Sequence, residues 1–191
     1  MNKPKVFMTS DLHLCHDREF LYKPRGFNTI WEMNETIVNN WNSIVNMGDQ
    51  IYVLGDLMLN DNDTGIKLIK QLKGDIHIIR GNHDTDTRMQ LYNDCYNIVE
   101  ITEGQFFKYD KYHFYLSHYP CIVSNYDADK PLKARTISLC GHSHTKDKFQ
   151  DIDKGLIFHV ELDTNNCYPW LLDDIIEDIK NKIKEKGYNN E

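Results

Sequence analysis

The sequence of 191 residues lacks several patterns that mark specialised classes of protein. Its five cysteines stand far apart and form no CxxC pair, which argues against a disulfide framework or a zinc ribbon and favours reduced thiols. No apolar run reaches the length of a transmembrane helix. The opening residues, MNKPKVFMTS, contain no apolar secretion segment. We therefore expect a cytoplasmic protein with no membrane partner.

Basic residues are outnumbered by acidic ones. The chain has 22 Lys and Arg against 29 Asp and Glu, which gives a formal net charge of −7. Tight, sequence-independent binding to nucleic acid requires Lys and Arg to neutralise phosphates, so the composition does not favour that class. An enzyme acting on a single phosphate group is not excluded, because bound cations would supply the positive charge.

The composition is otherwise that of an ordinary globular protein, with 40% hydrophobic and 27% charged residues. The length suits one domain with a sizeable core. No low-complexity linker or fixed-period repeat interrupts the chain. We expect a single domain over residues 1–185, followed by a polar tail over 186–191.

Strand and helix patterns alternate in the first half of the chain, and strands dominate the second half. The expected strands are residues 5–10, 50–55, 75–81, two strands around a turn at 110–111 within 105–118, 136–141 and 156–163. The expected helices are 28–45, with Asn28 as a possible N-cap, 64–73, 85–94 and 170–185. This order predicts an α/β protein, with two packed sheets and helices outside them.

Candidate metal ligands follow directly after the expected strands. These ligands are Asp11, His13, Asp56, Asn82, His118, His142 and His144. Loops after the carboxyl ends of strands converge on one edge of an α/β sheet, which is where sites form. Carboxylate, amide and imidazole ligands suit Mn²⁺, Fe²⁺ or Zn²⁺. The set is larger than one ion needs and would serve two ions.

Each of these motifs is weak by itself. A lone DxH occurs in many proteins, and a lone GD after a strand is usually a turn with an Asx hydrogen bond. GNHD and GHSH could each be a polar loop. The ordered set DxH, GD, GNHD, SH and GHxH is far more specific, and it contains five of the nine histidines.

The ordered set resembles the calcineurin-like metallophosphoesterase superfamily, and the resemblance runs from Asp11 to His144. It is most similar to small, single-domain bacterial and phage predicted phosphoesterases, which share a SHYP element. The resemblance implies a four-layer α/β/β/α sandwich of two mixed sheets flanked by helices. It also implies two divalent ions whose native identity stays open. By that resemblance, Asp11, His13 and His144 hold the first ion, Asn82, His118 and His142 hold the second, and Asp56 bridges both.

The resemblance further implies hydrolysis of a phosphomonoester or phosphodiester by a metal-bridging hydroxide. His83 matches the histidine that faces the scissile phosphate and protonates the leaving oxygen. One position departs from the pattern: Leu59 stands where some members carry a second Asp that orients this histidine. The alternatives for that role are Asp61, Asp63 or Asp84, or a backbone carbonyl.

Other residues carry weaker expectations. His16 and Arg18 follow the first motif and are candidate substrate-binding residues, whereas Asp163 and Asn165 follow a late strand and could enter the substrate pocket. The expected partner is a small phosphorylated substrate or a phosphodiester, and the oligomeric state is open.

Two alternative functions remain. A nuclease or nucleic-acid end-processing enzyme would use the same site but needs a basic track, and only a short cluster, Lys130, Lys133 and Arg135, is visible. A non-catalytic binding scaffold on the same fold is the second alternative, although all seven ligands and His83 are present.

Overall fold

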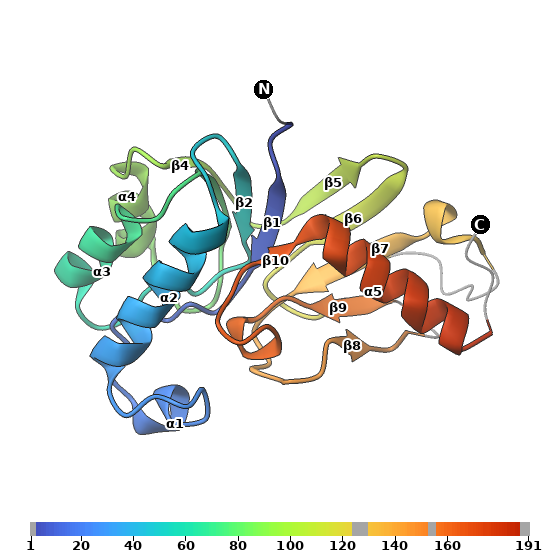
Figure 1. Ribbon diagram of the computed structural model, residues 1–191. Helices are drawn as coiled ribbons and strands as arrows, with labels where there is room; N and C mark the ends of the chain where they lie inside the picture. Colours follow the sequence, from blue (N-terminus) through green and yellow to red (C-terminus); the bar gives the residue numbers. More distant parts are fainter. Residues whose placement is uncertain (1–2, 124–129, 153–155, 188–191) are drawn as a thin grey trace.

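The computed structural model describes residues 3–123, 130–152 and 156–187, and it contains two five-stranded mixed sheets with helices (Figure 1). The strands are β1 (Val6–Thr9), β2 (Gln50–Val53), β3 (Asp75–Ile79), β4 (Ile98–Thr102), β5 (Gln105–Tyr109), β6 (Tyr112–Leu116), β7 (Thr136–Cys140), β8 (Phe149–Gln150), β9 (Ile157–His159) and β10 (Trp170–Leu171). The helices are α1 (Glu19–Tyr22), α2 (Ile30–Ile44), α3 (Asn62–Ile69), α4 (Asp86–Asn93) and α5 (Leu172–Glu185), with 3₁₀ turns at Leu132–Ala134 and Leu162–Thr164.

The first sheet has the strand order β10-β1-β2-β3-β4. Strands β1 to β4 are parallel, with Phe7 opposite Ile51 and Ile51 opposite Ile76, while β10 pairs with β1 in the antiparallel sense. Parallel neighbours require crossover connections, which α2, α3 and α4 supply. Figure 1 shows these three helices together on one side of the sheet. The carboxyl ends of β1, β2 and β3 therefore lie at one edge.

The second sheet has the strand order β5-β6-β7-β9-β8. Strands β5 and β6 form the expected hairpin around Asp110 and Lys111, with Tyr109 opposite Tyr112. Strands β6, β7 and β9 run parallel, and β8 is an antiparallel edge strand. Because β6 and β7 are parallel neighbours, their carboxyl ends lie side by side.

Alternate residues of β1 belong to two different apolar clusters, as the period of two in a strand requires. Phe7 lies in the cluster that the sheet forms with Ile37 and Trp41 of α2. Met8 lies in the second cluster, together with Phe114 and Phe158 of the other sheet. Helix α5 adds its apolar stripe to this second cluster. The predicted architecture, two packed mixed sheets with helices, is confirmed.

The start of α2 differs from the expectation. Its N-cap is Thr29 and not Asn28: the Thr29 hydroxyl accepts the backbone N–H of Glu32 at 3.2 Å. The Glu32 carboxylate in turn accepts the N–H of Asn28, the residue before the cap, at 2.9 Å, so the two side chains satisfy N–H groups at the start of the helix. Helix α3 also begins earlier than expected, because Asp61 caps it by accepting the N–H of Thr64 at 3.0 Å.

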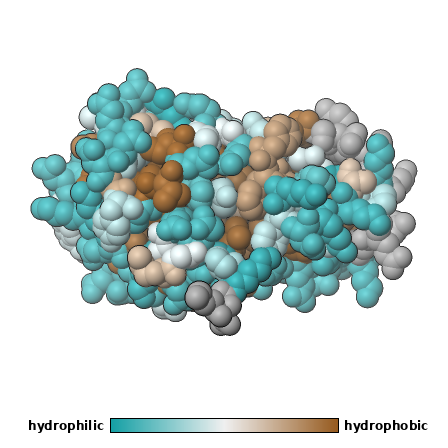
Figure 2. Space-filling model, turned by 90° about the horizontal axis from the view of Figure 1, so that it is seen from above, coloured by the Kyte–Doolittle hydropathy of each residue, from teal (hydrophilic) through white to brown (hydrophobic). Residues whose placement is uncertain are grey.

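Figure 2 shows a largely hydrophilic surface in the view from above, with a few clusters of hydrophobic residues near its middle. Among the helices that the structure describes, none is long and apolar enough to cross a bilayer. Four residues of the expected polar tail, 188–191, lie outside the described residues.

Candidate metal centre

The loops after β1 and β2 run side by side as a continued backbone ladder. The N–H of Asp11 donates to Gly55 O at 3.0 Å, and the N–H of His13 donates to Asp56 O at 3.0 Å. Leu14 continues the ladder with a parallel bridge to Met58. These bonds place the DxH motif beside the GD motif, although the two are more than forty residues apart in the sequence.

The loop after β3 is tied to the loop after β2 by two carboxylates. Asp84 Oδ2 accepts the N–H of Asp56 at 2.7 Å and the N–H of Gly81 at 2.9 Å. Asp56 Oδ1 accepts the N–H of His83 at 2.8 Å. A Cβ at Gly81 would overlap the side chain of Asp56. The glycine of the GNHD motif is therefore needed for this close approach.

The loops after β6 and β7 of the second sheet lie against the DxH loop of the first sheet. His118 O accepts the N–H of Gly141 at 3.0 Å, and Asp11 Oδ2 accepts the N–H of His142 at 2.8 Å. A Cβ at Gly141 would overlap the side chains of Ser10 and Asp11. The SH and GHSH motifs therefore face the DxH motif across the contact between the sheets.

Many of the residues at this edge have a left-handed backbone. Positive φ angles occur at Asp11 (57°), His13 (50°), Asp56 (59°), His142 (76°) and His144 (47°). Such conformations are uncommon for residues other than glycine and cost roughly 1–3 kcal/mol each. All five residues are candidate metal ligands, and backbone strain of this kind clusters at functional sites.

The first group of converging atoms consists of Asp11 Oδ1, His13 Nε2 and His144 Nε2. His13 Nε2 lies 3.1 Å from His144 Nε2, and each nitrogen lies 3.6 Å from Asp11 Oδ1. Asp11 Oδ1 is buried and accepts no hydrogen bond from the described part of the chain. A buried carboxylate oxygen without a donor is the arrangement expected of a metal ligand.

The second group contains Asn82, His118 and His142. Asn82 Oδ1 lies 2.8 Å from His118 Nε2 and 2.9 Å from His142 Nδ1. His118 Nδ1 lies 2.8 Å from the carbonyl of Leu54, which requires the proton of a neutral ring to be on Nδ1. His118 Nε2 then presents a lone pair toward Asn82 Oδ1, which is also an acceptor. Two acceptors that face each other at this distance fit a shared cation.

Asp56 lies between the two groups. Its Oδ2 is 3.7 Å from His13 Nε2 and 3.6 Å from His118 Nε2. Burial raises the pKa of Asp56. Burial also acts to raise the pKa of Asp11, but the neighbouring His13 and His144 imidazoles outweigh it and lower that pKa to about 2. Two buried carboxylates among imidazoles fit divalent cations, since ligands about 2 Å from one ion stand roughly 3–3.5 Å apart.

The His83 ring is not oriented by any of the proposed acids. It is half-buried and lies edge-on to His13, at a centroid distance of 5.6 Å, with His16 at 6.2 Å. Asp84 accepts backbone N–H groups and the hydroxyl of Tyr92, at 2.9 Å. Asp61 caps α3, and Asp63 is exposed in that helix. The ring contacts that the structure gives for His83 are therefore with imidazoles.

The two candidate substrate-binding residues, His16 and Arg18, have different surroundings. His16 lines a cavity of about 330 Å³ together with four other histidines, Phe20 and Leu21. Burial lowers the pKa of His16 to about 4. Arg18 is exposed, and its guanidinium donates to the carbonyl of Asp17 at 3.3 Å. The structure therefore brings His16, but not Arg18, to the cavity wall.

Sequence reasoning did not find Arg25, whose buried guanidinium donates two hydrogen bonds to Asp163. Asp163 also lies 3.3 Å from His144 Nδ1. Burial acts to raise the pKa of Asp163, but the hydrogen bonds with His144 and Arg25 hold it well below its usual range. Asn165 lies elsewhere, with its amide donating to the carbonyls of Tyr168 and Pro169. No sequence signal marks Arg25, which stands in the irregular loop KPRGF.

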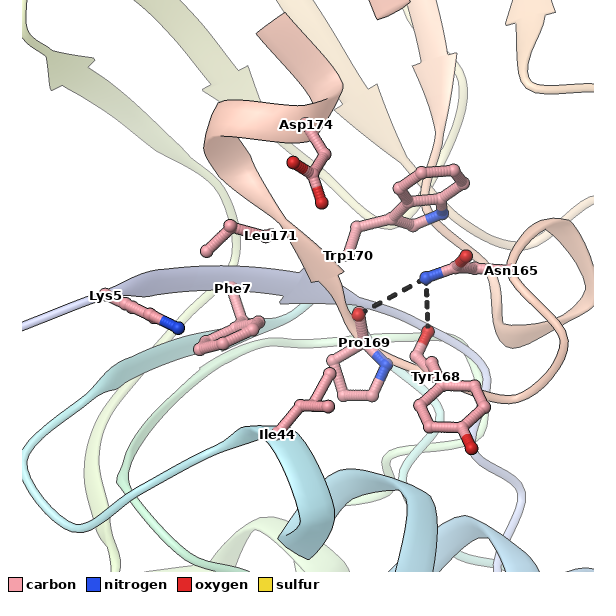
Figure 3. A pocket seen from close by; sticks show the side chains of 9 residues that line it. All are labelled: Lys5, Phe7, Ile44, Asn165, Tyr168, Pro169, Trp170, Leu171 and Asp174. Carbon is pink, nitrogen blue, oxygen red and sulfur yellow. Dashed lines mark hydrogen bonds between the residues drawn. The ribbon is translucent and has the colours of Figure 1, made fainter. Parts of the chain in front are cut away.

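Two other features lie apart from this centre. A cavity of about 360 Å³ beside β1, β10 and the start of α5 is lined by Lys5, Phe7 and Asp174, among others (Figure 3), and it includes none of the candidate ligands. Arg135, a member of the short basic cluster, is buried and donates to the carbonyl of Ile152 at 3.1 Å. Its burial shortens the basic track that binding to nucleic acid would use.

Two known proteins resemble this chain over most of its length. The uncharacterized protein MJ1445 of Methanocaldococcus jannaschii is 31% identical over 192 residues, which cover 98% of this chain and 95% of that protein. A protein of unknown function from Aquifex aeolicus, AQ665, has a similar fold, with a TM-score of 0.64 and 19% identity over 93% of this chain and all of that one.

A family model described as the calcineurin-like phosphoesterase superfamily domain matches residues 5–160. The match covers most of the chain, including every candidate ligand and His83. Because this model matches more than half of the chain, the chain belongs to the calcineurin-like phosphoesterase superfamily.

Proposed function

We propose that the chain is a metal-dependent phosphoesterase that hydrolyses a phosphomonoester or phosphodiester at a centre of two divalent cations. The observation that carries the proposal is the convergence of seven potential ligands from the strand ends of both sheets. Asp11, His13 and His144 would hold one ion, and Asn82, His118 and His142 would hold the other. Asp56 would contact both, since it lies between the two groups.

The donor set fits Mn²⁺, Fe²⁺ or Zn²⁺. Such ions, when bound, supply positive charge for the phosphate oxygens and lower the pKa of a water molecule, so that hydroxide is available near neutral pH. Four of the potential ligands are buried, namely Asp11, His13, Asp56 and His118. The other three, Asn82, His142 and His144, are exposed to solvent. The phosphate would therefore approach from the side of the exposed ligands.

His83 would act on the substrate rather than hold an ion. Its ring lines the cavity beside His13, and its backbone N–H is fixed by Asp56. A histidine at this place can donate a hydrogen bond to a phosphate oxygen and a proton to the leaving oxygen. Phe20 and Leu21 form an apolar part of the same wall, where the organic group of the substrate would lie.

The test combines metal analysis with a His83→Ala variant. Purified protein loaded with Mn²⁺ should hold about two ions per chain. His83→Ala should keep both ions and lose about 10²–10⁴-fold in turnover of the preferred substrate, chosen from a panel of phosphomonoesters, phosphodiesters and cyclic phosphoesters. The control is His113→Ala, because His113 is exposed on β6 and should leave both measurements unchanged.

Three outcomes would count against the proposal. Protein that binds no ion after Mn²⁺ loading would exclude the metal centre. A His83→Ala variant as fast as the unmodified chain would remove the proton-donor role. Protein that binds two ions yet hydrolyses no phosphoester in the panel would favour the non-catalytic scaffold.

A further inference from the structure

Arg25, Asp163 and His144 form a chain of hydrogen bonds behind the first group of potential ligands. Arg25 follows α1, His144 follows β7 and Asp163 follows β9, so three separate loops meet here. The side chains of Arg25 and Asp163 are 1% and 9% exposed. A buried ion pair of this kind persists only where both groups are well hydrogen-bonded.

The Arg25 guanidinium is anchored on several sides. Its Nε and Nη2 donate to the two carboxylate oxygens of Asp163, at 3.0 and 2.7 Å, in a bidentate pair. Nη2 also donates to the carbonyl of Asp11 at 2.8 Å, and Nη1 donates to the carbonyl of Leu12 at 3.4 Å. Arg25 therefore fixes the Asp163 carboxylate relative to the DxH loop.

Asp163 in turn fixes the ring of His144. His144 Nδ1 lies 3.3 Å from Asp163 Oδ2, so an Nδ1–H would donate to the carboxylate. The opposite nitrogen, Nε2, is then free to offer its lone pair toward His13 Nε2 and Asp11 Oδ1, at 3.1 and 3.6 Å. A carboxylate behind a ligating imidazole sets both the tautomer and the direction of the ring.

We propose that Asp163, held by Arg25, is a positioning residue that directs His144 Nε2 toward the cation shared with Asp11 and His13. The inference rests on the metal centre of the proposed function and not on the identity of its substrate. Asp163 lies beyond residues 5–160, the part of the chain that the family model matches. Arg25 lies inside that part, and neither residue belongs to the motifs that supply the potential ligands.

The effect should be confined to one ion. The ligands of the other group do not contact Asp163: His118 is supported by the carbonyl of Leu54, and His142 lies beside Asn82. The backbone of the His142–His144 loop is held separately, because the N–H of Ser143 donates to the buried Glu161 carboxylate at 3.2 Å. Loss of the Asp163 charge should therefore release the His144 ring while the loop stays in place.

The experiment is a titration of metal-free protein with Mn²⁺, followed by calorimetry and by electron paramagnetic resonance. Asp163→Asn keeps the shape of the side chain and removes its charge. One of the two dissociation constants for Mn²⁺ should rise about 10–100-fold, which is the usual effect of removing the outer partner of a ligand, and the other should stay unchanged. The resonance of the coupled ion pair should give way to that of a single ion at limiting Mn²⁺.

A second variant is needed because Asp163→Asn leaves the buried Arg25 without its carboxylate partner. Arg25→Met combined with Asp163→Leu removes both charges, which is commonly far less destabilising than breaking a buried pair on one side, and it should weaken the same single ion. Asp178→Asn is the matched control, because it breaks the partly exposed pair between Asp178 of α5 and Lys148 and should leave both constants unchanged. Circular dichroism verifies that each variant is folded.

The outcomes separate this inference from the proposed function. If the unmodified chain binds no Mn²⁺, the metal centre itself fails. If the unmodified chain binds two ions and both folded variants do so with unchanged constants, only the role of Asp163 fails. An equal rise in both dissociation constants would also overturn the positioning role of Asp163, because that result indicates a general structural role.

Discussion

Several of the residues proposed to hold metal adopt backbone conformations that their side chains disfavour. Asp11, His13, Asp56, His142 and His144 all have φ between 47° and 76°. The left-handed region costs an L-residue roughly 1–2 kcal/mol, whereas glycine adopts it readily. The metal-free protein is therefore less stable than its fold would allow, and the lost stability is concentrated at the site.

Substitution of His142 tests this strain, because His142 is exposed and has the largest φ of the five, 76°. In the presence of a chelator, His142→Gly should be more stable than His142→Ala by about 0.5–1 kcal/mol, since only alanine retains a Cβ in the left-handed region. Urea unfolding followed by circular dichroism gives the difference. An alanine variant as stable as the glycine variant would show that the loop relaxes without strain.

Phe20 offers a test of substrate contact at the same scale. Its side chain is 73% exposed, next to the ring of His16 at the cavity wall. Phe20→Ala should raise KM several-fold for a substrate with an apolar or aromatic group and change kcat little, while the melting temperature stays constant. Trp31→Ala, at another exposed aromatic residue on α2, is the control. An unchanged KM would remove Phe20 from the substrate contact.

At the scale of elements, one carboxylate joins the ends of β2 and β3. Asp84 accepts hydrogen bonds from the N–H groups of Asp56, Leu57 and Gly81 and from the hydroxyl of Tyr92. It is 1% exposed, so these donors have no access to water. Asp84 thus sets the positions of two ligand-bearing loops without facing the metal centre itself.

Asp84→Asn should destabilise the metal-free protein by about 1–3 kcal/mol, because the amide NH₂ would face backbone donors that then stay unsatisfied. It should also weaken metal binding through Asp56. Urea unfolding and Mn²⁺ titration measure the two effects. Asp86→Asn serves as the control, because Asp86 is exposed and forms a salt bridge with Arg80 at the surface. If Asp84→Asn and Asp86→Asn show the same stability and the same affinity for Mn²⁺, Asp84 does not hold the two loops in place.

The elements that bear the motifs could be predicted from the sequence, because short apolar runs that end at polar residues mark buried strands. Strands such as β2 and β3 and helix α2 follow from periodicity. Helix α1, with four residues, and β4 were missed, because neither has a clear apolar period. The Arg25–Asp163 pair joins residues 138 positions apart, so no local pattern could reveal it. Its detection required the fold.

At the scale of the whole molecule, the potential ligands divide between the two sheets. Four of them, Asp11, His13, Asp56 and Asn82, follow strands of the first sheet, whereas His118, His142 and His144 follow strands of the second. A cation bound by both sets prefers the folded state, because unfolding separates its ligands.

Mn²⁺ should therefore raise the melting temperature of the metal-free protein. At one hundred times the dissociation constant, each ion adds about 2.7 kcal/mol to the free energy of unfolding. Scanning calorimetry with and without a chelator measures the shift. Asp56→Asn should remove most of it, because Asp56 lies between both groups. A variant that retains the full shift would contradict the bridging position.

The pKa of Asp11 predicts an acid-dependent loss of stability in the metal-free protein. This pKa is about 2 in the folded chain, against an ordinary value of 3.8. The unfolded state then binds more protons between about pH 4 and pH 2, so stability rises with pH across this window. The contribution, on the order of 2 kcal/mol, is present above pH 4 and lost as the pH falls toward 2.

The measurement compares the unmodified chain with Asp11→Asn by urea unfolding at several pH values between 2 and 5. The variant should lose less stability over the window. Asp17→Asn, at an exposed position, should behave like the unmodified chain. Equal losses for the unmodified chain and Asp11→Asn would show that another acid governs the response.

The division of the ligands between the two sheets also has a consequence for the level of the protein in a cell. When divalent metal is scarce, the two sheets lack the ions that would link them, while the residues with left-handed backbone remain at the site. The unfolded fraction then grows, and proteases remove unfolded chains continuously. The abundance of this protein should therefore follow the supply of its metal, even where its gene is transcribed at a constant rate.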